Sequence, residues 1–178
     1  YENNPDAKFS IIVDIDDDPQ ILADFACFLK DEKTESEWGA LRAELGIEKP
    51  IDAYFELGNE RDESPGWKFN QKQMEYYMER ARKIIDAVDA VCPEMKYIAC
   101  GKTAMWNDPE GTVKWTRGLA EALGKDMDYV SMHPYYSGYE LSLVEPYFKM
   151  EMDVLDEVLG EGHGIKLYIT EHAKWPAL

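Results

Sequence analysis

Three segments of the sequence place polar and ionisable residues directly after apolar runs. They are Asn59 with Glu60, His133 with Tyr135 and Tyr136, and Glu171 with His172. Two glutamates in one site are what glycoside hydrolysis requires, because one carboxyl group must donate a proton while the other stays charged. Proximity can create that difference, since a neighbouring negative charge and partial burial raise the pKa of one carboxyl group. Glu60 and Glu171 are therefore candidates for an acid and a nucleophile.

Each glutamate taken alone has a simpler interpretation. A glutamate at the end of a strand can form a surface ion pair or cap the N-terminus of a helix. An asparagine directly precedes Glu60, however, and a pair of tyrosines follows another predicted strand between the two glutamates. The joint pattern favours a shared site over two independent surface residues.

Alternating strands and helices are predicted to bring these segments together. Apolar, β-branched runs indicate strands, and apolar residues at helical spacing indicate the helices between them. The strands are predicted at residues 8–15, 53–57, 96–100, 128–132 and 166–170, and the helices at 21–29, 74–91, about 112–123 and about 141–159. Strict alternation favours right-handed βαβ units and a parallel sheet. In a parallel α/β barrel the reacting groups lie at the C-terminal ends of the strands, which is where all three polar segments fall.

The acidic turn after the first predicted strand could suggest other kinds of site. An open doubly wound sheet that binds a nucleotide usually carries a G-x-G-x-x-G motif, and none occurs. Asp14, Asp16 and Asp18 have the spacing of the first ligands of an EF-hand, but Pro19 and Phe25 stand where its glycine and final glutamate belong. The turn is therefore predicted to cap a helix rather than bind calcium.

Composition bounds the classes of partner. The 178 residues carry a formal net charge of −17, which opposes binding to nucleic acid or to an anionic membrane. No run of 18 apolar residues is present, so no membrane span is expected. Cys27, Cys92 and Cys100 lie within apolar patterns and are expected to be buried thiols. The chain opens with Tyr1, so its natural N-terminus is expected to be absent and its localisation, cytoplasmic or secreted, stays open.

The segment YFELGNE, residues 54–60, resembles the acid/base motif of clan A glycoside hydrolases. These are (β/α)8-barrel enzymes in which an Asn-Glu pair closes the fourth strand. The chain is most similar to family 51, the α-L-arabinofuranosidases. Five segments resemble, in the same order, that family's segments from the third to the seventh strand: LADFACFLK, EWGALRAELGIEKPIDAYFELGNE, YIACG, DYVSMHPYY and YITEHAKW. The resemblance covers most of the chain. Phe55 stands where the family often has Trp, and TEHAKW replaces a commoner Asp-Glu-Trp.

The resemblance implies a role for each polar residue. Glu60 would be the general acid/base, Glu171 the nucleophile, and Asn59 a donor to the sugar 2-hydroxyl. His133 and Tyr135 would line the pocket. The implied reaction is a retaining double displacement on a plant-type polysaccharide or oligosaccharide, with no metal or organic cofactor.

Four aromatic residues near these predicted loops are candidates for stacking on sugar faces, with ordinary packing as the alternative. They are Trp67, Trp106, Tyr136 and Trp175.

Chain length predicts an incomplete barrel. A full (β/α)8 barrel needs about 250 residues, whereas residues 1–178 supply about five β/α units, placed by the resemblance as the third to the seventh. We expect one partial barrel domain that belongs to a longer protein or is an unusual partial barrel. Its unpaired strand edges should require the remaining barrel segments or lead to self-association.

Two other classes of function stay open. A non-catalytic carbohydrate-binding or scaffold domain would keep the barrel geometry without turnover, and a turnover assay separates it from an enzyme. A metal-dependent barrel hydrolase or isomerase would use Glu60, His133, Glu171 and His172 as ligands, and metal analysis of the protein tests that alternative.

Overall fold

A computed structural model describes residues 7–63, 65–103, 108–136 and 144–174. The main sheet consists of five parallel strands: β1 (Phe9–Val13), β2 (Ala53–Leu57), β3 (Lys96–Cys100), β4 (Tyr129–Met132) and β6 (Lys166–Ile169). They lie side by side in the order in which they occur along the chain. A small second sheet pairs β5 (Tyr135–Tyr136) with β7 (Ala173–Lys174), also in parallel.

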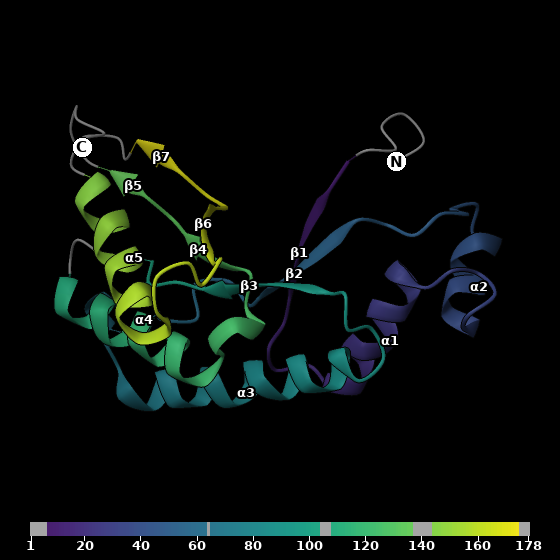
Figure 1. The fold of residues 1–178 in the computed structure, drawn as a ribbon, viewed down its shortest axis with the longest axis horizontal. Helices are drawn as coiled ribbons and strands as arrows, with labels where there is room; N and C mark the ends of the chain where they lie inside the picture. Colours follow the sequence, from purple (N-terminus) through teal and green to yellow (C-terminus); the bar gives the residue numbers. More distant parts are fainter. Residues whose placement is uncertain (1–6, 64, 104–107, 137–143, 175–178) are drawn as a thin grey trace.

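The helices connect successive strands. They are α1 (Pro19–Lys30), α2 (Glu37–Glu44), α3 (Gln71–Asp89), α4 (Pro109–Ala122) and α5 (Glu145–Leu159), with 3₁₀ turns η1 (Pro65–Trp67) and η3 (Gly124–Asp126). Figure 1 shows α1, α3, α4 and α5 gathered on one side of the sheet. A right-handed crossover repeated without a change of direction keeps every helix on the same side and curls the sheet, as in a (β/α)8 barrel. The topology is that of a barrel segment rather than a doubly wound sheet.

The five strands and four helices predicted from the sequence are confirmed, with ends that shift by a few residues. Part of the last predicted helix, residues 141–143, lies outside the described residues. The sequence did not predict α2, β5, β7 or the 3₁₀ turns η1 and η3. Helix α2 buries little apolar surface and is held instead by Arg42, whose Nη1 donates to the carbonyl oxygens of Phe28 and Leu29 over 2.7 and 3.1 Å.

Side-chain capping explains where the helices begin. Asp18 accepts a hydrogen bond from the backbone N–H of Gln20 over 3.0 Å, and Pro19 occupies the first turn of α1. This confirms that the acidic turn caps a helix. Asn70 and Asp108 accept equivalent bonds at the starts of α3 and α4. Among the described residues no helix is long and apolar enough to cross a membrane.

The hydrophobic core lies between the sheet and the helices. Side chains alternate along β2, so Ala53, Phe55 and Leu57 enter this core. The ring of Phe55 stacks on Phe25 of α1 with centroids 5.8 Å apart. All three cysteines are buried and free, as expected from the sequence.

The opposite face of the sheet corresponds to the interior of a barrel. Tyr129 contacts Tyr54 on one side and Tyr168 on the other, with ring centroids 5.7 and 5.5 Å apart. The sequence also led us to expect Ile12, Phe55 or their neighbours at an uncovered inner face. Ile12 is 54% exposed, but Phe55 is fully buried, because the alternation that directs Phe55 toward the helices leaves Tyr54 and Glu56 for the inner face.

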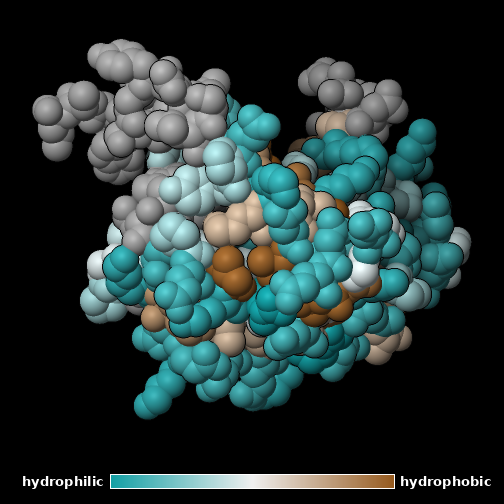
Figure 2. Space-filling model, turned by 60° about the vertical axis from the view of Figure 1, so that its left-hand side comes forward, coloured by the Kyte–Doolittle hydropathy of each residue, from teal (hydrophilic) through white to brown (hydrophobic). Residues whose placement is uncertain are grey.

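Apolar surface remains open to solvent. Figure 2 shows apolar atoms, in brown, at the surface in the middle of one face of the molecule. Among the described residues, the large hydrophobic side chains that are exposed include Phe9 and Ile12 of β1 and Ile169 of β6. These two strands are the edges of the main sheet. An exposed parallel edge with apolar side chains favours pairing with another chain.

We expect the 20.5 kDa chain by itself to self-associate or to bind dyes that report exposed apolar surface. The physical reason is that β1 and β6 each pair on one side only within the described sheet. Light scattering measures the mass, and an apolar fluorescent dye measures the exposed surface. A mass equal to one chain, sharp cooperative unfolding and no dye binding would show that five strands close their own core.

A second expectation concerns Glu151, which is buried in α5. The Thr116 hydroxyl of α4 donates a hydrogen bond to Glu151 Oε2, and Oε1 has no partner among the described residues. Burial raises the pKa of the Glu151 carboxyl to about 7, and the negative charge of Asp62 acts in the same direction. Above the ordinary value of 4.5 the unfolded chain loses a proton that the folded state keeps. The free energy of unfolding should therefore fall as pH rises from about 4.5 to about 7.

Glu151→Gln should remove this pH dependence, because glutamine keeps the shape but does not ionise. The variant should gain stability on the order of 3 kcal/mol relative to the wild type when pH is raised from 5 to 8. Urea denaturation at both pH values, at one protein concentration, gives this difference. Glu157→Gln changes an exposed glutamate of the same helix and serves as the control. An identical pH dependence in Glu151→Gln and wild type would show that Glu151 ionises normally.

Candidate active site

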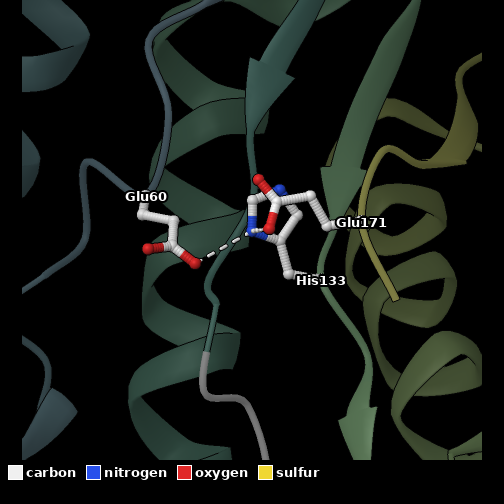
Figure 3. Close-up of side chains that lie close together, drawn as sticks. All are labelled: Glu60, His133 and Glu171. Atoms are coloured by element: carbon white, nitrogen blue, oxygen red, sulfur yellow. Dashed lines mark hydrogen bonds and ion pairs between the residues drawn. The ribbon is translucent and has the colours of Figure 1, made fainter. Parts of the chain in front are cut away.

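Three ionisable side chains converge at the C-terminal ends of β2, β4 and β6 (Figure 3). His133 Nδ1 lies 3.1 Å from Glu60 Oε1 and 4.0 Å from Glu171 Oε2. One carboxylate oxygen of each glutamate and the imidazole nitrogen all lie within 4.8 Å of one another. The structure therefore brings together the two glutamates singled out in the sequence, with His133 in contact with Glu60 and close to Glu171.

His133 is held firmly in place. The residue is 3% exposed, and its second ring nitrogen, Nε2, lies 2.9 Å from the Thr170 hydroxyl oxygen. A neutral imidazole has one donor and one acceptor nitrogen, so it can bond the hydroxyl on one side and the Glu60 carboxylate on the other. The ring thus links β4 to the loops after β2 and β6.

Glu171 has its own partner in the second sheet. The Tyr135 hydroxyl donates a hydrogen bond to Glu171 Oε2 over 2.6 Å. This bond raises the pKa of the Tyr135 phenol, with partial desolvation and the charge of Glu171 acting in the same direction. Tyr135 therefore remains a neutral donor that fixes one oxygen of the carboxylate.

A cavity of about 270 Å³ opens beside Glu171. Its lining combines hydroxyl, amide and carboxyl groups with apolar side chains: Ser10, Ile12, Glu56, Asn59, Tyr168, Ile169, Thr170 and Glu171. Asn59 is exposed, and it faces the same cavity as the glutamate. Polar groups that converge on a concave surface can form hydrogen bonds to a hydroxyl-rich ligand.

Glu56 is a lining residue that the sequence analysis did not single out. The Ser10 hydroxyl donates to its Oε2 over 3.2 Å, while its Oε1 has no hydrogen-bond partner among the described residues. Burial raises the pKa of the Glu56 carboxyl above its ordinary value. A glutamate inside an otherwise apolar strand was the available signal, because only the inner face of a barrel gives such a residue room.

The backbone of the loop after β2 directs Glu60 toward His133. Gly58 has a φ of 78°, and a Cβ at this position would lie 2.6 Å from the Cγ of Arg61. Glycine is therefore required there. Glu60 itself has a φ of 49°, a left-handed conformation that is uncommon for a residue with a side chain.

The remaining candidates from the sequence are the aromatic residues proposed to stack on sugars and His172. Trp67 lies half-buried in η1, and Tyr136 lies in β5, but the side chain of Tyr136 is outside the described structure. Trp106 and Trp175 also lie outside the described residues. His172 is exposed.

Three of the four metal ligands considered from the sequence come together in the structure. Within the described part of the chain, Glu60, His133 and Glu171 are the group whose ligand atoms lie close enough to surround one ion. His172, the fourth ligand considered from the sequence, does not belong to that group.

Comparison with known proteins relates the chain to one family. The model of the family described as "Alpha-L-arabinofuranosidase 1 domain" matches residues 6–151. This range includes Glu60 and His133 and ends before Glu171.

The curated relatives are arabinofuranosidases. An intracellular exo-α-(1→5)-L-arabinofuranosidase of Acetivibrio thermocellus is 26% identical over 125 residues, which cover 70% of this chain and 24% of the relative. Intracellular exo-α-(1→5)-L-arabinofuranosidase 1 of Bacillus subtilis is 30% identical over 121 residues, which cover 67% of this chain and 23% of the relative. The chain thus spans about a quarter of the length of the curated relatives it matches.

Solved structures share the fold. The α-L-arabinofuranosidase of Thermotoga maritima superposes with a TM-score of 0.72 at 17% identity, covering 95% of this chain and 34% of its own. The GH51 arabinofuranosidase of Xanthomonas axonopodis pv. citri gives a TM-score of 0.71 at 19% identity, covering 93% of this chain and 36% of its own. At this identity the likeness establishes the fold, and it confirms a partial (β/α)8 barrel.

Proposed function

The chain belongs to the α-L-arabinofuranosidase 1 domain family of glycoside hydrolases, and on this premise we propose that residues 1–178 form the catalytic part of a retaining arabinofuranosidase. One observation carries the proposal. An oxygen of Glu60, an oxygen of Glu171 and a nitrogen of His133 lie within 4.8 Å of one another at the C-terminal ends of the strands. In (β/α)8 barrels this edge of the sheet is the one that bears the reacting groups.

The separation of the two carboxylates favours retention over inversion. Retaining glycosidases hold their carboxyl groups roughly 5–5.5 Å apart, whereas inverting enzymes need about 6.5–9.5 Å to admit a water molecule between them. Oxygens of Glu60 and Glu171 that approach within 4.8 Å lie nearer to the retaining range than to the inverting one. The spacing supports direct attack by one carboxylate on the sugar.

In the first step Glu171 attacks the anomeric carbon. A bond forms between that carbon and a Glu171 oxygen, and the glycosidic C–O bond breaks as Glu60 gives its proton to the leaving oxygen. The leaving group departs as an alcohol, and the sugar stays bound to Glu171 as an ester. In the second step Glu60 takes a proton from a water molecule, which attacks the same carbon and releases Glu171 as a carboxylate.

The residues in contact with the two glutamates are consistent with Glu171 as nucleophile and Glu60 as acid/base. Tyr135 donates to the Glu171 oxygen that His133 also approaches, which leaves the other oxygen available to attack. His133 Nδ1 faces Glu60 and can hold its carboxyl group through both steps. We propose Asn59, which lines the cavity beside Glu171, as the contact to the sugar 2-hydroxyl. Tyr136, Trp106 and Trp175 remain proposed stacking residues.

The substrate and partners follow from the relatives. By likeness to the exo-α-(1→5)-L-arabinofuranosidases, we propose terminal α-L-arabinofuranosyl groups of plant-type oligosaccharides as substrates. Because the chain spans about a quarter of those relatives, we propose that further barrel segments complete the site. No cofactor takes part in either step.

Turnover of an aryl α-L-arabinofuranoside tests the proposal. The chain should be assayed alone and joined to segments that complete the barrel, with the anomer of the first-formed sugar followed by proton NMR. We expect hydrolysis with retention, unchanged after treatment with a chelator. Binding of the sugar without turnover by the completed barrel would favour the scaffold alternative, and loss of activity with the chelator would favour the metal-dependent one.

A further inference from the structure

A buried ion pair joins the loop that carries Glu60 to the loop after β3. Asp62 and Lys102 have side chains that are 1% exposed or less, and Lys102 Nζ lies 3.2 Å from Asp62 Oδ2. Thr103 makes two further hydrogen bonds to the Asp62 carboxylate, from its backbone N–H over 3.1 Å and from its hydroxyl over 2.8 Å. Lys102 also donates to the carbonyl oxygen of Trp67 over 2.8 Å. Among the described residues, the hydrogen bonds of the pair thus lie within these two loops.

The same loop contains unusual backbone conformations. Among the described residues, the non-glycine residues with positive φ are Glu60, at 49°, and Trp67, at 55°. Such conformations persist where the surrounding structure holds them, and they concentrate at functional sites. Asp62 lies two residues after Glu60, and Lys102 bonds Trp67 directly. The ion pair therefore fastens the loop next to both strained positions.

Stability alone does not account for a buried ion pair. Removing two charges from water costs free energy that their attraction often fails to recover, so apolar residues of similar volume are commonly as stabilising. A fully hydrogen-bonded pair does, however, fix a geometry that apolar side chains leave free to adjust. The loop after β2 is where geometry matters, because Glu60 must reach His133 across 3.1 Å.

We propose that Asp62 and Lys102 are positioning residues that hold Glu60 in its working orientation. The inference rests on the proposed function, in which Glu60 is the general acid/base. Neither residue touches the reacting atoms, and both act through the backbone of residues 58–67. The loop also has bonds from other elements: Gln73 Nε2 of α3 donates to the carbonyl oxygens of Arg61 and Glu63. The backbone N–H of Arg61 donates to Cys100 Sγ over 3.3 Å, and Arg61 Nη2 lies 2.9 Å from Asp16 Oδ2.

The double variant Asp62→Leu/Lys102→Met separates positioning from stability. It leaves no buried charge without a partner, so the protein should still fold. Hydrogen–deuterium exchange followed by mass spectrometry should show exchange in residues 58–67 at least about tenfold faster, with α3 unchanged. Ile84→Ala, a cavity in the core, should lower overall stability without this local effect.

Kinetics of the completed barrel provide a readout that a purely structural role would not change. Misplacing a general acid matters most when the leaving group is poor, so kcat/KM should fall at least about tenfold more for an alkyl than for a nitrophenyl arabinofuranoside. An equal loss with both substrates, or unchanged exchange in residues 58–67, would overturn the proposal. If the wild type shows no turnover, the proposed function fails. The exchange result alone then decides whether Asp62 and Lys102 hold the loop that carries Glu60.

A milder variant covers the case in which the double variant does not fold. Thr103→Val keeps both charges and removes only the hydroxyl bond to Asp62 Oδ1. Exchange in residues 58–67 should again be faster than in the wild type, by a smaller factor. Unchanged exchange in Thr103→Val would then overturn the proposal.

Discussion

Glu171→Ala should abolish turnover of every substrate, whatever its leaving group. Alanine has no oxygen to form the ester with the sugar, so the covalent route is lost for good and poor substrates alike. We expect kcat to fall by at least about four orders of magnitude. Initial rates with aryl and alkyl α-L-arabinofuranosides, measured on the chain joined to barrel-completing segments, provide the test.

The control for this variant is Glu145→Ala, which removes an exposed glutamate from the first turn of α5. It should retain wild-type rates, and both variants should unfold at similar denaturant concentrations. Residual activity above about one per cent in Glu171→Ala would assign the nucleophile to another residue.

Glu60→Ala should affect substrates according to their leaving groups. A nitrophenolate departs without protonation, so the first step should survive with nitrophenyl substrates while alkyl glycosides lose about three orders of magnitude in kcat/KM. The second step loses its general base in either case. Added azide, which needs no deprotonation, should restore turnover of the nitrophenyl substrate and release a glycosyl azide.

Glu63→Ala is the matched control for Glu60→Ala, because Glu63 is an exposed glutamate three residues later in the same loop. It should respond to neither the leaving group nor azide. An equal loss of rate with all leaving groups in Glu60→Ala, without rescue by azide, would contradict the assignment of Glu60 as acid/base.

The sequence allowed much of the framework to be predicted because the relevant signals are local. Periodicity located the five strands and four of the helices, and polar residues after strands pointed to the end of the sheet where Glu60, His133 and Glu171 meet. The direction of side chains was less secure. Phe55 or its neighbours were expected at the inner face, and the alternation along β2 places the neighbour Glu56 there while Phe55 is buried.

The parts that escaped prediction depend on contacts distant in sequence. Arg42 anchors α2 through carbonyl groups 13 and 14 residues away, which no apolar periodicity reveals. The partners of Asp62 lie 40 and 41 residues further along, so its burial could not be inferred from a charged stretch. Strands β5 and β7 have two residues each, too few for any pattern, although they position Tyr135 against Glu171.

Trapping of the glycosyl-enzyme tests the central claim most directly. In the Glu60→Ala variant with a nitrophenyl α-L-arabinofuranoside, the first step should outpace the second, so the covalent intermediate should accumulate. Intact mass spectrometry should show one added pentosyl group, and peptide mapping should place it on Glu171. Consumption of substrate with no adduct, or an adduct on any other residue, would contradict the account of Glu60 and Glu171 as an acid/base and nucleophile pair.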